Sequence, residues 1–133
     1  MNKKTIKVKK SESIIDAQVE LTSNGSKCLK IILSDGKTYS SSSSNFFDAL
    51  AILRQEAHKD GIEILCKGAQ LNVFPSGMCR SMGGGVAAYE LNMGKQARRD
   101  DLVNIFDYSD KDITADVEHQ KAYFSKWLSS LGD

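Results

Sequence analysis

The stretch SIIDAQVELTSNGSKCLKIILSDGKTYS, residues 13–40, alternates apolar and polar residues in two runs separated by turn signals. The apolar members of the two runs are Ile15, Ala17, Val19 and Leu21, followed by Leu29, Ile31 and Leu33. A period of two is typical of a strand with one buried face. Asn24-Gly25 and Asp35-Gly36 are dipeptides that favour tight hairpin turns. The stretch therefore predicts an antiparallel meander that ends in a short strand at residues 37–40.

The residues around this meander predict one more strand and one helix. Ile6 and Val8 alternate with lysines, which indicates a strand, and we expect it at an edge of the sheet. After the serine run, Ser44 or Asn45 can cap a helix. Apolar residues then recur at helical spacing from Phe46 to Ala57, and Gly61 provides a stop.

The second half of the chain is less regular. We expect strands at residues 62–66, 86–91 and 102–106, a short extension at 71–73, and one helical turn at 77–82. The polar connection that starts at Lys95 is a candidate for further helix. A terminal helix is predicted after Thr114, its expected N-cap, with an apolar stripe of Val117, Phe124, Leu128 and Leu131 flanked by Tyr123 and Trp127. The order predicts a single α+β domain over residues 1–133, a mostly antiparallel sheet with one central helix and one C-terminal helix packed on it.

Composition excludes several classes of protein. The chain has 133 residues, 41% of them apolar, and contains no run near the ~18 apolar residues of a membrane-spanning helix. The lysine-rich start lacks the apolar core of an export signal. Cys28, Cys66 and Cys79 are odd in number and lack metal-binding spacing, so we expect a reducing cytoplasm and no disulfide or zinc. A net charge of +1 argues against direct nucleic-acid binding.

The stretch SMGGGVAAYE, residues 81–90, raises the question of a phosphate-binding loop. A P-loop fails around Gly94-Lys95, because Tyr89 stands where the first glycine belongs and Gln96 follows the lysine. A dinucleotide fingerprint fails because Ala88 replaces its third glycine and a predicted strand follows. We therefore expect these glycines to serve the backbone, by positive φ or close approach, and we expect no cofactor.

Catalytic and metal-binding signatures are incomplete elsewhere as well. His58 and His119 have no companion at ligand spacing, and DYSDKD, residues 107–112, departs from the calcium-loop pattern. Cys79 lies beside Arg80, which would favour its thiolate, and Ser76 precedes a glycine, but neither has a local base. The sequence therefore predicts no enzyme and no metal site.

Residues 61–108 carry a more specific pattern. It comprises L-C-x-G-A, V-[FY]-P-S-G-M-x-R-x-M-G-x-G, A-Y, G-K-x-A and D-L-V-x-I-F-D, and it covers about a third of the chain. The matching positions include Cys66, Pro75, Ser76, Gly77, Met78, Arg80, Met82, Gly83, Gly85, Tyr89, Lys95 and Asp107. This stretch resembles immunity proteins of bacterial contact-dependent growth inhibition and Rhs-type polymorphic toxin systems. The resemblance implies a cytoplasmic, non-enzymatic inhibitor that binds the C-terminal domain of a cognate toxin.

No binding residue carries over from the resemblance, so the partner surface is predicted from charge. Residues 100–118 contain seven acids, Asp100, Asp101, Asp107, Asp110, Asp112, Asp116 and Glu118, against Lys111 alone. If the toxin is a nuclease, its active site is basic, and carboxylates can steer and hold it. We predict that Asp107, Asp110 and Asp112 bind the toxin, with Tyr108 as aromatic anchor. The overall charge of +1 departs from the strongly acidic character common among nuclease inhibitors of this kind.

Two alternatives remain at this stage. The first is a small hydrolase or transferase with its site in the Ser76–Gly85 loop, and the second is a nucleic-acid-associated regulator that uses the lysine-rich N-terminus. Clustering of Lys95, Arg98 and Arg99 with Arg80 would favour ligand chemistry, whereas a continuous carboxylate surface would favour a protein partner. The sequence leaves the oligomeric state open.

Overall fold

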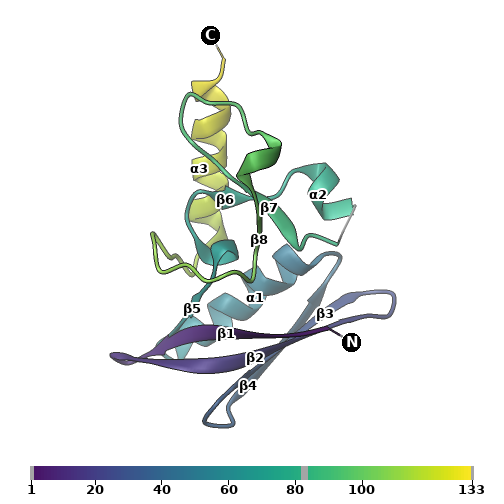
Figure 1. Cartoon of the computed structure of the whole chain (residues 1–133), viewed down its shortest axis with the longest axis vertical. Helices are drawn as coiled ribbons and strands as arrows, with labels where there is room; N and C mark the ends of the chain where they lie inside the picture. Colours follow the sequence, from purple (N-terminus) through teal and green to yellow (C-terminus); the bar gives the residue numbers. More distant parts are fainter. Residues whose placement is uncertain (1, 82–83, 133) are drawn as a thin grey trace.

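The computed structural model describes residues 2–81 and 84–132 and has an α+β fold (Figure 1). Its main sheet has the strand order β4-β3-β2-β1-β5, and every neighbouring pair is antiparallel. The five strands are β1 (Asn2–Lys10), β2 (Ser13–Ser23), β3 (Lys27–Leu33), β4 (Thr38–Ser43) and β5 (Ile62–Leu65). The predicted meander is confirmed, and Gly25 and Gly36 both adopt φ +95°, which L side chains rarely adopt, at its turns.

The expectation that the first strand lies at an edge is wrong. β5 pairs with the second half of β1, from Lys7 opposite Leu65 to Lys10 opposite Ile62. Gly61, with φ +75°, leads the chain from the preceding helix directly into β5, whose first residue pairs with Lys10. The edges of the sheet are therefore β4 and β5, and only the first half of β1 lacks a second neighbour.

Helix α1 (Phe46–Lys59) covers one face of the main sheet. Of the two candidate caps, Asn45 is the one used, since its side chain accepts a hydrogen bond from the Asp48 N–H at 2.9 Å. Phe47, Leu50 and Leu53 are fully buried against the apolar face of the meander. The helix runs close to β4, where the Ser41 hydroxyl donates to the Ala49 carbonyl at 2.6 Å.

The later strands form a separate small sheet, which the sequence did not indicate. Its order is β6-β7-β8, with β6 (Val73–Phe74), β7 (Ala87–Glu90) and β8 (Leu102–Asn104). The connecting turns are η1 (Lys67–Ala69), α2 (Gly77–Ser81) and η2 (Arg99–Asp101). The expected helix from Lys95 is thus limited to η2. Met82 and Gly83, which belong to the predicted helical turn and glycine run, lie outside the described residues.

The terminal helix α3 (Val117–Ser130) packs on the small sheet, beside β6 (Figure 1). Its N-cap is Asp116 and not Thr114, because the Asp116 side chain accepts from the Glu118 N–H while Thr114 Oγ1 accepts from the Asp116 N–H. The buried face of α3 differs from the predicted apolar stripe at residues 127 and 128. Leu128 is half exposed, whereas Trp127 is buried and donates its indole N–H to the Lys95 carbonyl at 2.9 Å.

Two buried polar side chains join the two halves of the fold. Gln120 on α3 is completely buried, and its amide nitrogen donates to the carbonyls of Gly68, Gln70 and Val73 at 2.9–3.2 Å. Its amide oxygen accepts from Nη2 of Arg54 at 2.6 Å, and Arg54 on α1 is itself 2% exposed. Burial lowers the pKa of Arg54 to about 10, so the guanidinium remains charged at neutral pH.

We predict that Gln120→Leu destabilises the protein by about 3 kcal/mol or more, because it removes the acceptor of Nη2 of the buried Arg54, which keeps only the Thr114 carbonyl, and the donor to three carbonyls. Gln55→Leu is the matched control, since Gln55 is exposed on α1 and its replacement should change stability by about 0.5 kcal/mol or less. Urea unfolding followed by circular dichroism measures both. Similar losses for the two variants would contradict a central role for Gln120.

Candidate functional site

The predicted toxin-binding residues follow β8 in a segment held by its main chain. The Lys67 N–H donates to the Asp107 carbonyl at 2.8 Å, and the Leu71 N–H donates to the Asp112 carbonyl at the same distance. Tyr108 forms an isolated bridge with Cys66, next to the end of β5. Because the backbone makes these contacts, the side chains of Asp107, Tyr108, Asp110 and Asp112 are left exposed.

The structure brings Asp107 and Tyr108 to a cleft of about 420 Å³ beside β1. The cleft is lined by Lys4–Lys7 of β1, by Ile14 of β2 and by Phe106–Tyr108. Tyr108 is 50% exposed and Ile14 is 55% exposed, so the two present apolar surface to the same space. Sequence reasoning missed Ile14, although it is out of phase with the alternation of its own strand. The contact between Lys4 and Asp107 could not be predicted from the sequence, because 103 positions separate the two residues.

Charged and polar contacts surround this apolar surface. Lys4 donates to Asp107 at 2.6 Å, Lys7 pairs with Asp16, and the Tyr108 hydroxyl donates to Asp110 at 3.1 Å. Partial desolvation and then the hydrogen bond to Asp110 raise the pKa of Tyr108, so the phenol is neutral at physiological pH. Asp112 has a positive φ of 50° and does not line the cleft.

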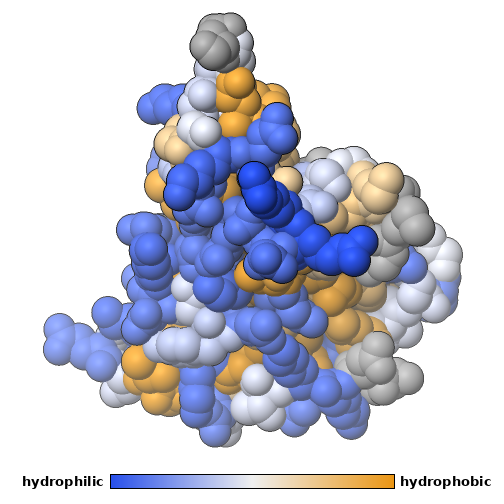
Figure 2. All heavy atoms as spheres, turned by 45° about the horizontal axis from the view of Figure 1, so that its top comes forward, coloured by the Kyte–Doolittle hydropathy of each residue, from blue (hydrophilic) through white to orange (hydrophobic). Residues whose placement is uncertain are grey.

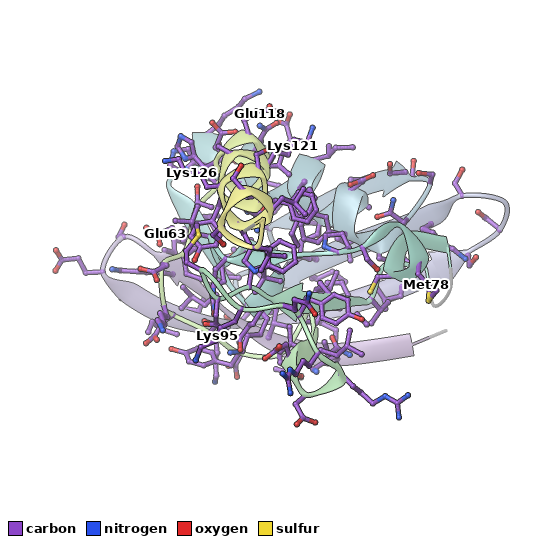
Figure 3. All side chains as sticks on the ribbon, turned by 90° about the horizontal axis from the view of Figure 1, so that it is seen from above. Glu63, Met78, Lys95, Glu118, Lys121 and Lys126 are labelled. Atoms are coloured by element: carbon purple, nitrogen blue, oxygen red, sulfur yellow. The ribbon has the colours of Figure 1, made fainter. Side chains whose placement is uncertain are left out.

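The seven acids of residues 100–118 do not form one continuous surface. Asp100 and Asp101 line a different, polar cleft of about 660 Å³ together with Lys95 and Arg98. Asp116 is occupied as the cap of α3, and Glu118 lies on the opposite side of that helix from Lys95 (Figure 3). Lys95 and Arg98 therefore line one cleft, as an anion-binding site would require, but the carboxylates of Asp100 and Asp101 line the same cleft. The side chain of Arg80 lies outside the described residues.

The Ser76–Gly85 loop packs on the start of α1. The Phe46 N–H donates to the Gly84 carbonyl at 2.6 Å, and the Gly85 N–H donates to the Cys79 carbonyl at 2.9 Å. Gly84 and Gly85 have φ values of +69° and +82°. The N-terminus of α1, where an anion could bind, is thus filled by the Gly84 carbonyl and the Asn45 side chain. Gly84 and Gly85 thus shape the backbone of this loop.

The nucleophile candidates of this loop have structural contacts. Ser76 Oγ accepts from the Cys79 N–H at 3.1 Å, as a cap of α2, and Cys79 is buried. Both histidines lie elsewhere, on a third cleft of about 590 Å³ that also includes Asp116. Burial raises the pKa of the Cys66 thiol to about 11, which disfavours a reactive thiolate. The three cysteines are unpaired.

Residues 2–81 and 84–132 contain neither a metal-binding cluster nor a membrane-spanning helix. In this part of the chain, no group of three or more His, Cys, Asp or Glu side chains could hold a metal ion. None of its helices combines the length and the apolar character required to cross a bilayer.

No model of a known protein family matches the chain, and no curated protein sequence matches it significantly.

We predict that Gly85→Ala destabilises the protein by about 1 kcal/mol or more beyond the cost of Gly94→Ala. Both glycines have a positive φ, +82° and +78°, so the backbone strain of the alanine is similar. Only at position 85 would the new Cβ lie 2.9 Å from Asn45 Oδ1, while the space around Gly94 is open. Thermal unfolding compares the two variants, and equal costs would show that the loop does not pack tightly on α1.

Proposed function

We propose that this protein is an immunity protein that binds the C-terminal domain of a cognate toxin, a nuclease, and blocks its active site without performing catalysis. The observation that carries the proposal is the cleft at which two half-exposed apolar side chains, Tyr108 and Ile14, are surrounded by charged residues. An aromatic anchor inside a polar rim is the usual anatomy of a protein–protein interface. The resemblance of residues 61–108 to toxin-system immunity proteins points to the same class of partner.

The acid best placed for a basic partner is Asp110, which lies two residues after Tyr108, because the cleft itself is lined by Lys4 and Lys7 as well as Asp107. Asp110 has no cation within ion-pair distance among the described residues, and its carboxylate accepts a hydrogen bond from the neutral Tyr108 hydroxyl. Asp107 is held by Lys4, so a cation of the toxin would have to compete with Lys4 for it. Hydrophilic side chains dominate the face in Figure 2, with small apolar areas between them. We propose that the carboxylates speed association and that Tyr108 provides most of the affinity.

The proposed location is the cytoplasm, where the three unpaired cysteines would remain reduced. The partner is a protein, and we propose no direct nucleic-acid or membrane binding and no cofactor. An enzyme centred on the Ser76–Gly85 loop is less favoured, because Ser76 caps α2 and the glycine carbonyl fills the N-terminus of α1.

The anchor is tested with Tyr108→Ala. The probe is the C-terminal domain of the toxin encoded by the open reading frame adjacent to this gene, and binding is measured by calorimetry alongside protection of growing cells. We expect a loss of about 2 kcal/mol, or roughly 30-fold in affinity, because the ring is an apolar anchor. Leu128→Ala on α3 is the matched control, since Leu128 is 49% exposed, and it should bind normally.

The acidic part of the surface is tested by comparing Asp110→Lys with Asp100→Lys. Both replace an exposed acid of the same sequence region, but Asp100 lines the other cleft. We expect Asp110→Lys to reduce the association rate tenfold or more at low salt, and Asp100→Lys to have little effect. Equal effects, or normal binding by folded Tyr108→Ala and Asp110→Lys, would refute this surface. The absence of a neighbouring toxin gene would count against the proposed function.

A further inference from the structure

The edge strand β4 has an unpaired row of backbone groups. The Leu33 N–H donates to the Lys37 carbonyl, so the residues at odd positions form the hydrogen-bonded pairs between β3 and β4. Bonded and non-bonded residues alternate along an antiparallel ladder. The N–H and C=O groups of Thr38, Ser40 and Ser42 therefore point away from β3. No described strand pairs with β4 on that side.

This edge lacks the protections that sheet proteins normally use. The six residues of β4, TYSSSS, include no charge and no proline. The register with β3 is continuous from Lys27 opposite Ser43 to Ile32 opposite Thr38, so no bulge interrupts it. A regular, uncharged, open edge is a template for another strand. The opposite edge strand, β5, is four residues long and carries Glu63.

An exposed apolar side chain lies beside the open edge. The Ala49 carbonyl on α1 receives the hydroxyl of Ser41 on β4, so this side of the helix faces β4. Ile52 follows Ala49 by three residues and is its neighbour on the helix surface. It is 46% exposed. The open backbone of β4 and an apolar helix residue thus lie along the same border of the domain.

We propose that two copies of this chain pair through β4, antiparallel and about a two-fold axis perpendicular to the sheet. Ser40 then lies opposite its own counterpart and Thr38 lies opposite Ser42 of the second copy. The two sheets join into one of ten strands, five from each copy. An axis of this orientation leaves both α1 helices on the same face, with Ile52 of each copy directed toward the other.

The chemistry of the strand selects a second copy as the occupant. Hydroxyl pairs such as Thr opposite Ser are favourable across strands, and this register brings no two like charges opposite one another. Lys37, the charged residue next to β4, lies opposite Ser43. Symmetric pairing of identical surfaces is also the commonest form of protein dimer. Since β2 and β3 separate β4 from β1, the dimer leaves the Tyr108 cleft open, and the inference does not depend on the proposed function.

The backbone contact is tested with Ser40→Pro, measured by sedimentation over a range of concentrations. Proline removes an N–H that points to the open edge and spares the ladder with β3. Thr5→Pro is the matched control, because Thr5 lies in the half of β1 that pairs with β2 but not with β5, and its N–H points to the side without a neighbouring strand. We expect the wild type and Thr5→Pro to approach twice the mass of one chain, and Ser40→Pro to dissociate at least tenfold more readily.

A second pair of variants and one measurement on the unchanged protein complete the test. Ile52→Lys should weaken the dimer at least tenfold, whereas Leu128→Lys, at a similar exposure on α3, should not. Hydrogen exchange of the wild type should show Thr38, Ser40 and Ser42 amides gaining protection as concentration rises. A wild type that is monomeric at every concentration, or a dimer without this protection, would overturn the proposal, even if Ser40→Pro fails to fold.

Discussion

The buried contact between Arg54 and Gln120 is the constraint on which the arrangement of the two halves depends. A guanidinium this deeply buried needs acceptors, because an unpaired charge inside a protein costs several kcal/mol. Arg54 finds them in the Thr114 carbonyl and in Gln120, which come from the chain around α3. Gln120 in turn donates to three carbonyls between Gly68 and Val73. One contact thus orients α1, the connection after β5 and α3 at the same time.

The same network reaches the proposed binding surface. Gln70, whose carbonyl accepts from Gln120, also accepts a hydrogen bond from the Ser109 hydroxyl at 2.6 Å through its side chain. Ser109 is buried and directly follows Tyr108. The backbone that carries the half-exposed ring of Tyr108 is therefore held in place by the buried hydrogen bond of Ser109. A rigid anchor loses little entropy on binding, which is what an interface residue requires.

The sequence predicted those parts of the fold that repeat a simple pattern. Alternation and turn dipeptides were enough for the meander, and helical spacing with a cap was enough for α1. The small sheet escaped because strands such as Val73–Phe74 are too short to show a period. The burial of Gln120 and Arg54 was not predicted, because an apolar stripe is defined by apolar residues alone. For the same reason the buried face of α3 was predicted to include Leu128 and not Gln120. Thr114 and Asp116 are both good caps, and only the hydrogen bonds distinguish them. Asp107 and Tyr108 could be predicted as a pair because they are neighbours in sequence. Their contact with β1 could not, because about a hundred residues separate the two segments.

The distribution of unsatisfied groups favours the Tyr108 cleft over the glycine-rich loop as the proposed binding surface. At that loop three polar groups have an internal use, because the Gly84 carbonyl and the Asn45 side chain accept from the first turn of α1 and Ser76 caps α2. A ligand there would have to displace bonds that the fold needs. At the Tyr108 cleft and along β4, in contrast, apolar surface or backbone groups face outward without an internal partner. Binding energy is available where folding has left such groups uncovered, so these two surfaces are where partners gain most.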